Sequence, residues 1–333
     1  MQIRVLDATA IREVLSMDRC IELMRRAFEM VATGETIQPV RQALGTPDGR
    51  GVVGWMPGYT ARPEWLGIKV ISVFPGNFGT AFGSHQGMVL LFEAAHGSPV
   101  AVLEAGTLTA IRTAAATAVA TDVLAPAGAR SLGILGYGEQ AETHIDALLR
   151  VRPFELISIW GRDLHRAARF AARSSERFGV RAVAVADARE AAHADVICAV
   201  TAATDPILHG AWLHAGQHLN LVGSSVPTAA EADEETIARG RLFVDFRESA
   251  LALSGEFRRA KARGLVTDEA IVGCVGDVIV GKVAARAAPT DITVFKSLGM
   301  ASEDLVASDF VYREAARRGL GVLLDWSSPA ESH

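Results

Sequence analysis

The sequence predicts an α/β fold with a doubly wound parallel sheet and a second α+β domain. Strand and helix patterns alternate from residue 126 onward, which is typical of βαβ units on a parallel sheet. Short β-branched runs separated by Gly and Pro precede this region, and a helical pattern lies at each end of the chain. With 50% hydrophobic and 21% charged residues, the composition is that of a globular chain rather than a disordered or coiled-coil one.

The N-terminal part combines helical patterns with several short strands. Residues 1–34 carry apolar residues at helical spacing, and Gly34 supplies a stop. Strands are expected over 52–56, 66–74, 88–92 and 100–103. A helix of small residues follows over 110–123, opened at Gly106 and ended by Pro126.

The second part alternates regularly between strand and helix. Strands are expected over 131–135, 156–160, 180–185, 196–200, 219–222, 242–245 and 292–295, with helices beginning at Glu139 and Leu164 and near Ala188. An amphipathic helix over 303–318 ends at Gly319, which is typical of a helix C-cap. The predicted domains are therefore 1–125 and 126–299, with segment 300–333 returning to the first.

Charge and cysteine content exclude several classes of protein. The net charge is −5 and no basic block occurs, which argues against nucleic-acid or anionic-membrane partners. No apolar run reaches the roughly 20 residues of a membrane span, and the N-terminus lacks a signal-peptide core. The cysteines Cys20, Cys198 and Cys274 are widely spaced, so neither a disulfide framework nor a CxxC metal site fits. We expect a cytoplasmic protein without a metal.

A glycine-rich turn follows the strand expected over 131–135. Its pattern is GxGxxA, and its residues are Gly136, Tyr137, Gly138, Glu139, Gln140 and Ala141. The first glycine allows a tight turn, the second lets phosphate approach the backbone, and the alanine lets the helix pack on the strand. The helix N-terminus then favours an anion. This context predicts a Rossmann-type domain that binds a dinucleotide.

The end of the next strand bears on the choice of cofactor. An NAD site usually has an acidic residue there to bind the ribose. Here Gly161 stands at the tip, and Arg162 could face a 2′-phosphate, while Asp163 is expected to cap the next helix. This favours NADP(H), with NAD(H) as the alternative. The competing interpretation of Arg162 is a solvated surface arginine.

Two cations occupy places where a cation is costly. Lys69 lies in the apolar run 66–74, where a buried ammonium needs an anion unless strand alternation turns it to solvent. Arg112 lies in the first turn of the helix expected to open at Gly106, where it opposes the helix dipole. His85 could contact a ligand or be structural, and Arg41 has no comparable local argument. No Ser-His-Asp, HExxH, P-loop or paired-carboxylate pattern supports a hydrolase or kinase.

Four segments together resemble the ornithine cyclodeaminase/mu-crystallin family. They are 83–92 (Gly-Ser-His-Gln-Gly-Met-Val-Leu-Leu-Phe), 108–117 (Leu-Thr-Ala-Ile-Arg-Thr-Ala-Ala-Ala-Thr), 136–141 (Gly-Tyr-Gly-Glu-Gln-Ala) and 292–304 (Ile-Thr-Val-Phe-Lys-Ser-Leu-Gly-Met-Ala-Ser-Glu-Asp). The segments occur in family order across most of the chain. The resemblance implies a homodimer, with an NAD(P)-binding domain beside a substrate-binding and dimerisation domain.

The resemblance also implies roles for individual residues. Arg41, Lys69 and Arg112 would converge on the carboxylate of an amino or imino acid, with Lys69 and Arg112 as the catalytic pair and Ser225 also at the substrate. Beyond the glycine-rich turn, the implied cofactor contacts are Ser84, His85, Thr113, Gly161, Arg162, Asp163, Thr201, Ala202, Val222, Gly223, Ser225, Lys296 and Ser297.

Two positions separate the branches of the family. Cyclodeaminases carry an aspartate two residues after the glycine that ends the strand near 219–222, and here that position is Ser225. A cyclodeaminase glutamate is also missing, with Met56 in its place. The lyase activity would survive only if Glu231 or Asp233 replaced the aspartate. The sequence is more similar to the mu-crystallin branch, whose members reduce cyclic ketimines with a nicotinamide cofactor.

We therefore expect an NAD(P)H-dependent reductase of α-imino carboxylates. Its substrates would be cyclic ketimines of the pyrroline- or piperideine-2-carboxylate type, and its products cyclic L-amino acids. The alternatives are an amino-acid dehydrogenase or N-alkyl amino-acid synthase on open-chain keto acids, an ornithine cyclodeaminase, and a nucleotide-dependent binder of small molecules without turnover.

Overall fold

The computed structural model describes residues 1–77, 80 and 82–326. The chain divides into two compact units, the first formed by Met1–Arg112 with Met300–His333 and the second by Thr113–Gly299. The division falls inside one helix, α3 (Ala105–Leu124), whereas the sequence placed it just after this helix. Because this boundary lies inside a continuous helix, no Pro-rich, Gly-rich or polar linker marks it, and the composition of the sequence gives no sign of it.

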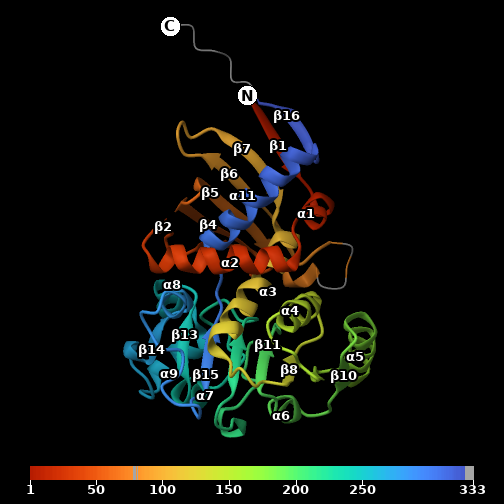
Figure 1. Cartoon of the computed structure of the whole chain (residues 1–333), viewed down its shortest axis with the longest axis vertical. Coiled ribbons are helices and arrows are strands. Elements are labelled where there is room, and N and C mark those ends of the chain that lie inside the picture. The colour runs from red at the N-terminus through yellow and green to blue at the C-terminus, as the bar shows by residue number, and fades with distance from the viewer. Residues whose placement is uncertain (78–79, 81, 327–333) are drawn as a thin grey trace. The chain divides into compact units, whose positions relative to one another are not determined.

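Unit 1 contains an eight-stranded mixed sheet. Its strands are β1 (Gln2–Leu6), β2 (Thr36–Ile37), β3 (Gln42–Gly45), β4 (Val52–Ala61), β5 (Glu64–Val73), β6 (His85–Glu93), β7 (Pro99–Glu104) and β16 (Val322–Asp325). Their order is β16-β1-β7-β6-β5-β4-β2, with β3 also paired to β4 (Figure 1). Strands β1 and β7 are parallel, while β4, β5, β6 and β7 form antiparallel neighbours.

The expectation of one helical segment over residues 1–34 is wrong. The chain begins with strand β1 and continues with two helices, α1 (Ala8–Val14) and α2 (Met17–Ala32). The side chain of Asp7 caps α1 by accepting from the Ala10 N–H, and Ser16 caps α2 in the same way. These two capping residues start new helices, which a count of apolar spacing alone does not reveal.

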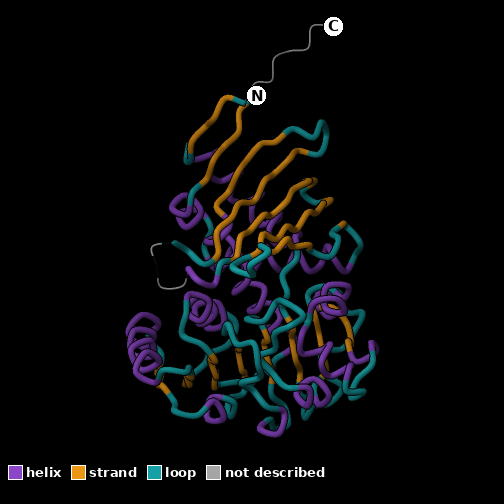
Figure 2. Tube along the Cα trace, turned by 180° about the vertical axis from the view of Figure 1, so that it is seen from behind, coloured by secondary structure: helices purple, strands orange, loops and turns teal. Residues whose placement is uncertain are grey.

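Helix α11 (Ala301–Arg318) packs on one face of this sheet, over β4, β5 and β6, and also contacts α2 (Figure 1). Val89 and Leu91 on that face are fully buried. The helix ends at Gly319, whose φ of 71° is the left-handed conformation expected of a C-cap. The opposite face of the sheet is toward the viewer in Figure 2. Gly67 faces Leu305 of α11, so its neighbour Leu66 points to this opposite face and is 43% exposed, and Met88 on β6 is 46% exposed.

Unit 2 is built on an all-parallel sheet of eight strands, ordered β10-β9-β8-β11-β12-β15-β13-β14. The strands are β8 (Ser131–Leu135), β9 (Leu156–Trp160), β10 (Arg181–Ala184), β11 (Val196–Ala199), β12 (His218–Leu221), β13 (Arg241–Val244), β14 (Ile271–Cys274) and β15 (Thr293–Lys296). The predicted fold class is confirmed. The order reverses between β8 and β11, and ligands of such sheets bind at the carboxyl ends beside this point.

Besides the second part of α3, the helices of unit 2 are α4 (Glu139–Leu149), α5 (Leu164–Phe178), α6 (Ala188–Ala191), α7 (Glu234–Arg239), α8 (Arg247–Leu253), α9 (Gly255–Ala262) and α10 (Val275–Ile279). They flank the sheet, and every residue of β11 and β12 is buried. Within the described ranges, no helix is long and apolar enough to cross a membrane. Over the same residues, no group of three or more His, Cys, Asp or Glu could hold a metal ion.

Candidate active site

The glycine-rich turn lies between β8 and α4, beside the reversal of strand order. Gly136 has a φ of 127°, and a Cβ there would lie 2.9 Å from the carbonyl oxygen of Val200. Only glycine fits both constraints. Gly138 is the N-cap of α4 and provides no side-chain cap for the N–H groups of the first turn. These groups are donors of the kind that bind phosphate at a helix N-terminus.

Two arginines follow β9, Arg162 in the loop and Arg166 in the first turn of α5, while the one acid between them, Asp163, caps that helix. Asp163 accepts a hydrogen bond from the Arg166 N–H at 3.0 Å, so the prediction that it caps α5 is confirmed. Arg162 is exposed. The guanidinium of Arg166 lies over the ring of Tyr137, 5.0 Å from its centroid. Arg166 was not among the predicted site residues, although its place three residues after the capping Asp163 puts it in the first turn of α5.

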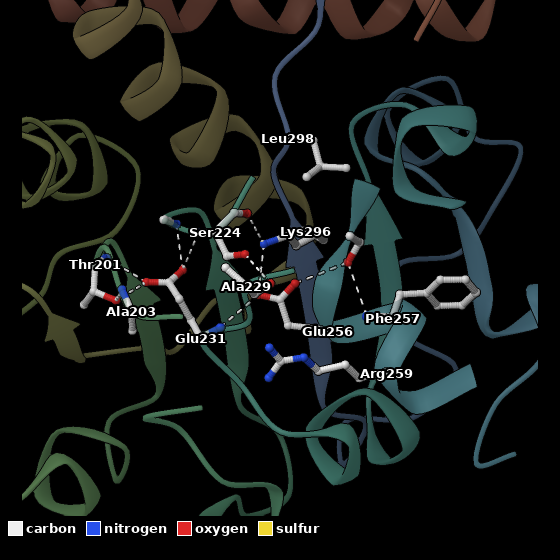
Figure 3. A network of polar contacts seen from close by, with 12 residues as sticks. Thr201, Ala203, Ser224, Ala229, Glu231, Glu256, Phe257, Arg259, Lys296 and Leu298 are labelled. Carbon is white, nitrogen blue, oxygen red and sulfur yellow. Dashed lines mark hydrogen bonds and ion pairs between the residues drawn. The ribbon is translucent and has the colours of Figure 1, made fainter. Parts of the chain in front are cut away.

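The loops that follow β11 and β12 hold several of the predicted cofactor residues. Ala202 and Gly223 are exposed, while Thr201, Val222 and Ser225 are partly buried. Beneath them lies a polar network that includes Thr201, Ser224, Glu231, Glu256 and Lys296 (Figure 3). Burial raises the pKa of Glu231, and the nearby ammonium of Lys296 opposes that rise.

Lys296, a predicted cofactor contact at the end of β15, turns its side chain into this network. Its Nζ donates to the carbonyl oxygen of Ser224 at 2.5 Å and pairs with Glu256 Oε1 at 3.1 Å (Figure 3). The residue is 0% exposed. The next residue, Ser297, is also buried, and its N–H donates to the carbonyl of Leu221 at 3.0 Å. Both side chains therefore lie inside unit 2 rather than at its surface.

In unit 1, the structure brings Lys69 and Arg112 together on one carboxylate. Lys69, on β5, places Nζ 2.7 Å from Asp304 Oδ2. Arg112 donates from Nε to Asp304 Oδ1 at 2.9 Å and from NH1 to Glu303 Oε2 at 2.7 Å. Lys69 is 3% exposed, so it does not face solvent, and its internal partner is an acid of α11. Glu303 and Asp304 were predicted as the start of a helix and as part of the family segment 292–304, but not as partners of these two cations.

Burial and the charges of this cluster together lower the pKa of Lys69. Burial, and then the nearby Arg112 guanidinium, lower the pKa of Lys69 to about 8, while the carboxylates of Asp304 and Glu303 oppose the fall. The thiol of Cys20 senses the same charges, and burial raises its pKa. An ammonium with a pKa near neutral can bind an anion and can also change protonation within the working range of an enzyme.

The helix-dipole argument for Arg112 is wrong. Helix α3 begins at Ala105, so Arg112 lies beyond its first turn. The carboxylate of Glu104 accepts from the N–H groups of Gly106 and Thr107 at 2.5 and 2.8 Å, which already satisfies the helix N-terminus. The anions that compensate Arg112 are the two acids of α11.

The remaining predicted residues lie at several places. Arg41 directly precedes β3 and is partly exposed. Ser84 Oγ lies 3.0 Å from His85 Nδ1 at the start of β6. Thr113 is buried in α3, and its carbonyl accepts a hydrogen bond from the hydroxyl of Thr117 at 3.0 Å.

Comparison with known proteins gives a consistent set of relatives. Residues 1–319 match the ornithine cyclodeaminase/mu-crystallin family. The ketimine reductase mu-crystallin of Mus musculus is 41% identical over 285 residues, which are 86% of this chain and 87% of that protein. A Delta(1)-pyrroline-2-carboxylate reductase of Bacillus cereus is 33% identical over 324 residues, 97% of this chain and 99% of that protein.

Two solved structures have the same fold over nearly the whole chain. The Thermococcus litoralis Delta(1)-pyrroline-2-carboxylate reductase in complex with NADH and L-proline superposes with a TM-score of 0.93 at 31% identity, covering 96% of this chain and 99% of that one. An archaeal alanine dehydrogenase dimer with bound NAD also superposes with a TM-score of 0.93, at 27% identity, covering 98% and 100%.

Proposed function

Because this chain belongs to the ornithine cyclodeaminase/mu-crystallin family, we propose that it is an NAD(P)H-dependent reductase of α-imino carboxylates. Its substrates are cyclic ketimines of the pyrroline- or piperideine-2-carboxylate type, which it reduces to cyclic L-amino acids. The observation that carries the proposal is the convergence of Lys69 and Arg112 on Asp304 in a buried cluster. The similarity to ketimine and pyrroline-2-carboxylate reductases supports the chemistry.

The buried cations bind the carboxylate of the substrate. Lys69 and Arg112 are balanced by Glu303 and Asp304, which keep both cations charged and oriented inside unit 1. An arriving carboxylate adds one negative charge, and Arg41 supplies the further cation that compensates it. Holding the carboxylate fixes the imine carbon in a single orientation, and such positioning lowers the barrier by several kcal/mol.

The turn from Gly136 to Gly138 fits the pyrophosphate of a dinucleotide. Gly136 leaves the turn free of a side chain, and the uncapped N–H groups of α4 donate to the phosphate oxygens. The loops after β11 and β12 carry Thr201 and Gly223 at the adjacent carboxyl edge. When bound, the nicotinamide supplies the hydride that reduces the imine carbon.

The end of β9 favours NADP(H) over NAD(H). Arg162 is exposed there, and the capping role of Asp163 turns the local acid toward the N-terminus of α5. Arg166, braced over Tyr137, adds a second guanidinium. Two arginines match the charge of a 2′-phosphate, which guanidinium groups bind through several hydrogen bonds. The related structures with NADH and NAD keep NAD(H) as the alternative.

The exposed apolar face of the unit 1 sheet supports a homodimer. Val53, Leu66 and Met88 on neighbouring strands are 39%, 43% and 46% exposed, and exposed apolar surface of this kind marks protein interfaces. The archaeal alanine dehydrogenase relative is a dimer.

The three cysteines are free thiols, in keeping with a reducing, cytoplasmic setting.

The test is turnover by the purified chain with a panel of imines. NADPH or NADH oxidation is followed with 1-pyrroline-2-carboxylate, 1-piperideine-2-carboxylate, and pyruvate with ammonia, beside ammonia release from ornithine with NAD. We expect rapid NADPH oxidation with a cyclic imine. Ammonia release from ornithine would replace the proposal with a lyase, and nucleotide binding without any turnover would replace it with a binder.

A second candidate is an amino-acid dehydrogenase acting on open-chain keto acids. Similarity to an alanine dehydrogenase of Archaeoglobus fulgidus, 28% identical over 325 residues, favours it. Turnover with pyruvate and ammonia but with neither cyclic imine would establish this activity instead.

A further inference from the structure

Glu231 joins the two loops that follow strands β11 and β12, which are parallel neighbours in the sheet. Its Oε1 accepts hydrogen bonds from the backbone N–H and the hydroxyl of Thr201, at 2.6 and 2.8 Å. Its Oε2 accepts from the N–H groups of Gly223 at 2.6 Å and Ser224 at 3.2 Å. Figure 3 shows this carboxylate between the two loops.

The backbone of Glu231 is held as firmly as its side chain. Its carbonyl accepts from the N–H groups of Ile207 and Leu208 at 2.9 and 3.0 Å. Its own N–H donates to Glu256 Oε1 at 3.1 Å. Glu231 is 0% exposed, so water does not substitute for its hydrogen bonds. All of its polar groups therefore hold neighbouring segments in place, and none faces solvent.

The arrangement requires a carboxylate and a close approach of the loops. Three of the donors are backbone N–H groups and the fourth is a hydroxyl, so both oxygens of Glu231 must accept. An amide would present an NH₂ group to one of these loops. At Gly223, a Cβ would overlap the carbonyl oxygen of Thr201, so only glycine lets the loops meet over the carboxylate.

Lys296 and Glu256 support the same loops from beneath. Glu256 comes from α9, and its Oε1 receives both the N–H of Glu231 and the ammonium of Lys296. That ammonium also donates to the carbonyl of Ser224 at 2.5 Å. Two carboxylates and one ammonium thus link β15 and α9 to the loops at the edge of the sheet (Figure 3).

We propose that Glu231 is a positioning residue for the nicotinamide cofactor, which it orients through the loops at Thr201 and at Gly223 and Ser224 without touching it. The inference rests on the proposed function, because that function assigns these loops to the cofactor. In this arrangement the side chain of Lys296 acts on the cofactor site through the Ser224 carbonyl and not by direct contact. Loss of the Glu231 carboxylate loosens both loops together.

The test compares E231Q with D195N in the full-length protein. Asp195 makes the same kind of contact at the opposite edge of the sheet, where its Oδ2 accepts from the N–H groups of Arg130 and Ser131 and from the Ser131 hydroxyl, at 2.8 to 2.9 Å. NADPH dissociation constants, kcat and both KM values are measured, with hydrogen–deuterium exchange and thermal melting. E256Q, which retains an oxygen acceptor, is the milder second variant.

We expect E231Q to weaken NADPH binding by about tenfold or more, since hydrogen bonds to a charged group are lost. Amide exchange should rise in the peptides covering 200–204 and 222–226, and E256Q should show a smaller change of the same sign. D195N should lower the melting temperature and leave NADPH binding unchanged. If E231Q does not fold, E256Q decides by the same measurements.

The inference is overturned if a folded E231Q protein binds NADPH with wild-type affinity, even if its melting temperature falls. If E231Q does not fold, wild-type NADPH affinity of E256Q overturns it in the same way. Equal weakening of NADPH binding by D195N also overturns it, because the effect would then be one of general stability. A wild-type protein that binds neither NADPH nor NADH overturns the proposed function itself, and with it the cofactor role of these loops.

Discussion

Replacing Asp304 with Asn should lower kcat/KM for the imine and shift the alkaline limb of its pH profile to lower pH. Asp304 is the carboxylate that Lys69 and Arg112 share, at 2.7 and 2.9 Å. It counteracts the burial and the Arg112 charge that lower the pKa of Lys69 to about 8. Without that carboxylate the pKa of Lys69 falls further, and Lys69 is uncharged over more of the neutral range.

The magnitude follows from the loss of one close, buried ionic contact. A change of one pKa unit corresponds to about 1.4 kcal/mol, and we expect a shift of about one unit or more. Under the proposed function the protonated Lys69 binds the substrate carboxylate, so kcat/KM should fall as pH rises through the pKa of Lys69, and the fall should come earlier in D304N. Breaking a buried pair costs about 3 to 5 kcal/mol of stability, a large part of the roughly 5 to 15 kcal/mol that stabilises a folded protein, so the folding of D304N has to be measured beside its activity.

The assay is kcat/KM against pH at saturating NADPH, with thermal melting of each protein. D309N is the matched control, because Asp309 lies on the same helix and accepts from Trp65 Nε1 of β5 at 2.7 Å. It should lose some stability and keep the wild-type pH profile. A D304N protein that melts early but keeps the wild-type alkaline limb would refute the assignment of Lys69 to the substrate carboxylate.

Two further substitutions test the cofactor preference and the dimer. Arg162→Ala should raise KM for NADPH about tenfold or more, because a charged hydrogen bond is lost, and it should leave KM for NADH unchanged. The control is Arg173→Ala, at an exposed residue of α5. Equal effects of Arg162→Ala on both cofactors would contradict a 2′-phosphate contact. Met88→Asp should convert the dimer to monomers in light scattering, because it places a charge on the exposed apolar face, whereas Leu265→Asp in unit 2, at a residue 52% exposed, should not. A dimeric Met88→Asp protein would exclude that face as the interface.

Local sequence patterns predicted seven of the eight strands in the parallel sheet of unit 2. The central strands β11 and β12 are short and fully buried, and the Val-, Ile- and Leu-containing runs that cover them are readable from the sequence alone. The glycine-rich turn was equally readable because its residues are consecutive. Strand β14 and helices α7 to α10 were missed, since each of these segments is only four to eight residues long.

The pairing of charges could not be predicted in the same way. The sequence indicated that Lys69 and Arg112 needed anions, but Asp304 and Glu303 lie about two hundred residues away along the chain. A cation buried in an apolar strand needs an anionic partner, but the local sequence does not show which acid the fold places beside it. The strand pair β1 and β16 is another case, since its residues come from opposite ends of the chain.

The positions of two acids bear directly on the choice between reduction and cyclodeamination. Cyclodeaminases have an aspartate at the position of Ser225, and Glu231 and Asp233 were the two acids that could replace it in this chain. Glu231 is committed to the loops at Thr201 and Gly223, and turning it toward a substrate would strand buried donors at about 1 to 3 kcal/mol each. Asp233 caps α7 and accepts from the Gly210 N–H at 2.9 Å. Since both carboxylates are already committed to the backbone, the geometry favours hydride transfer to a bound imine over the acid–base steps of ammonia loss.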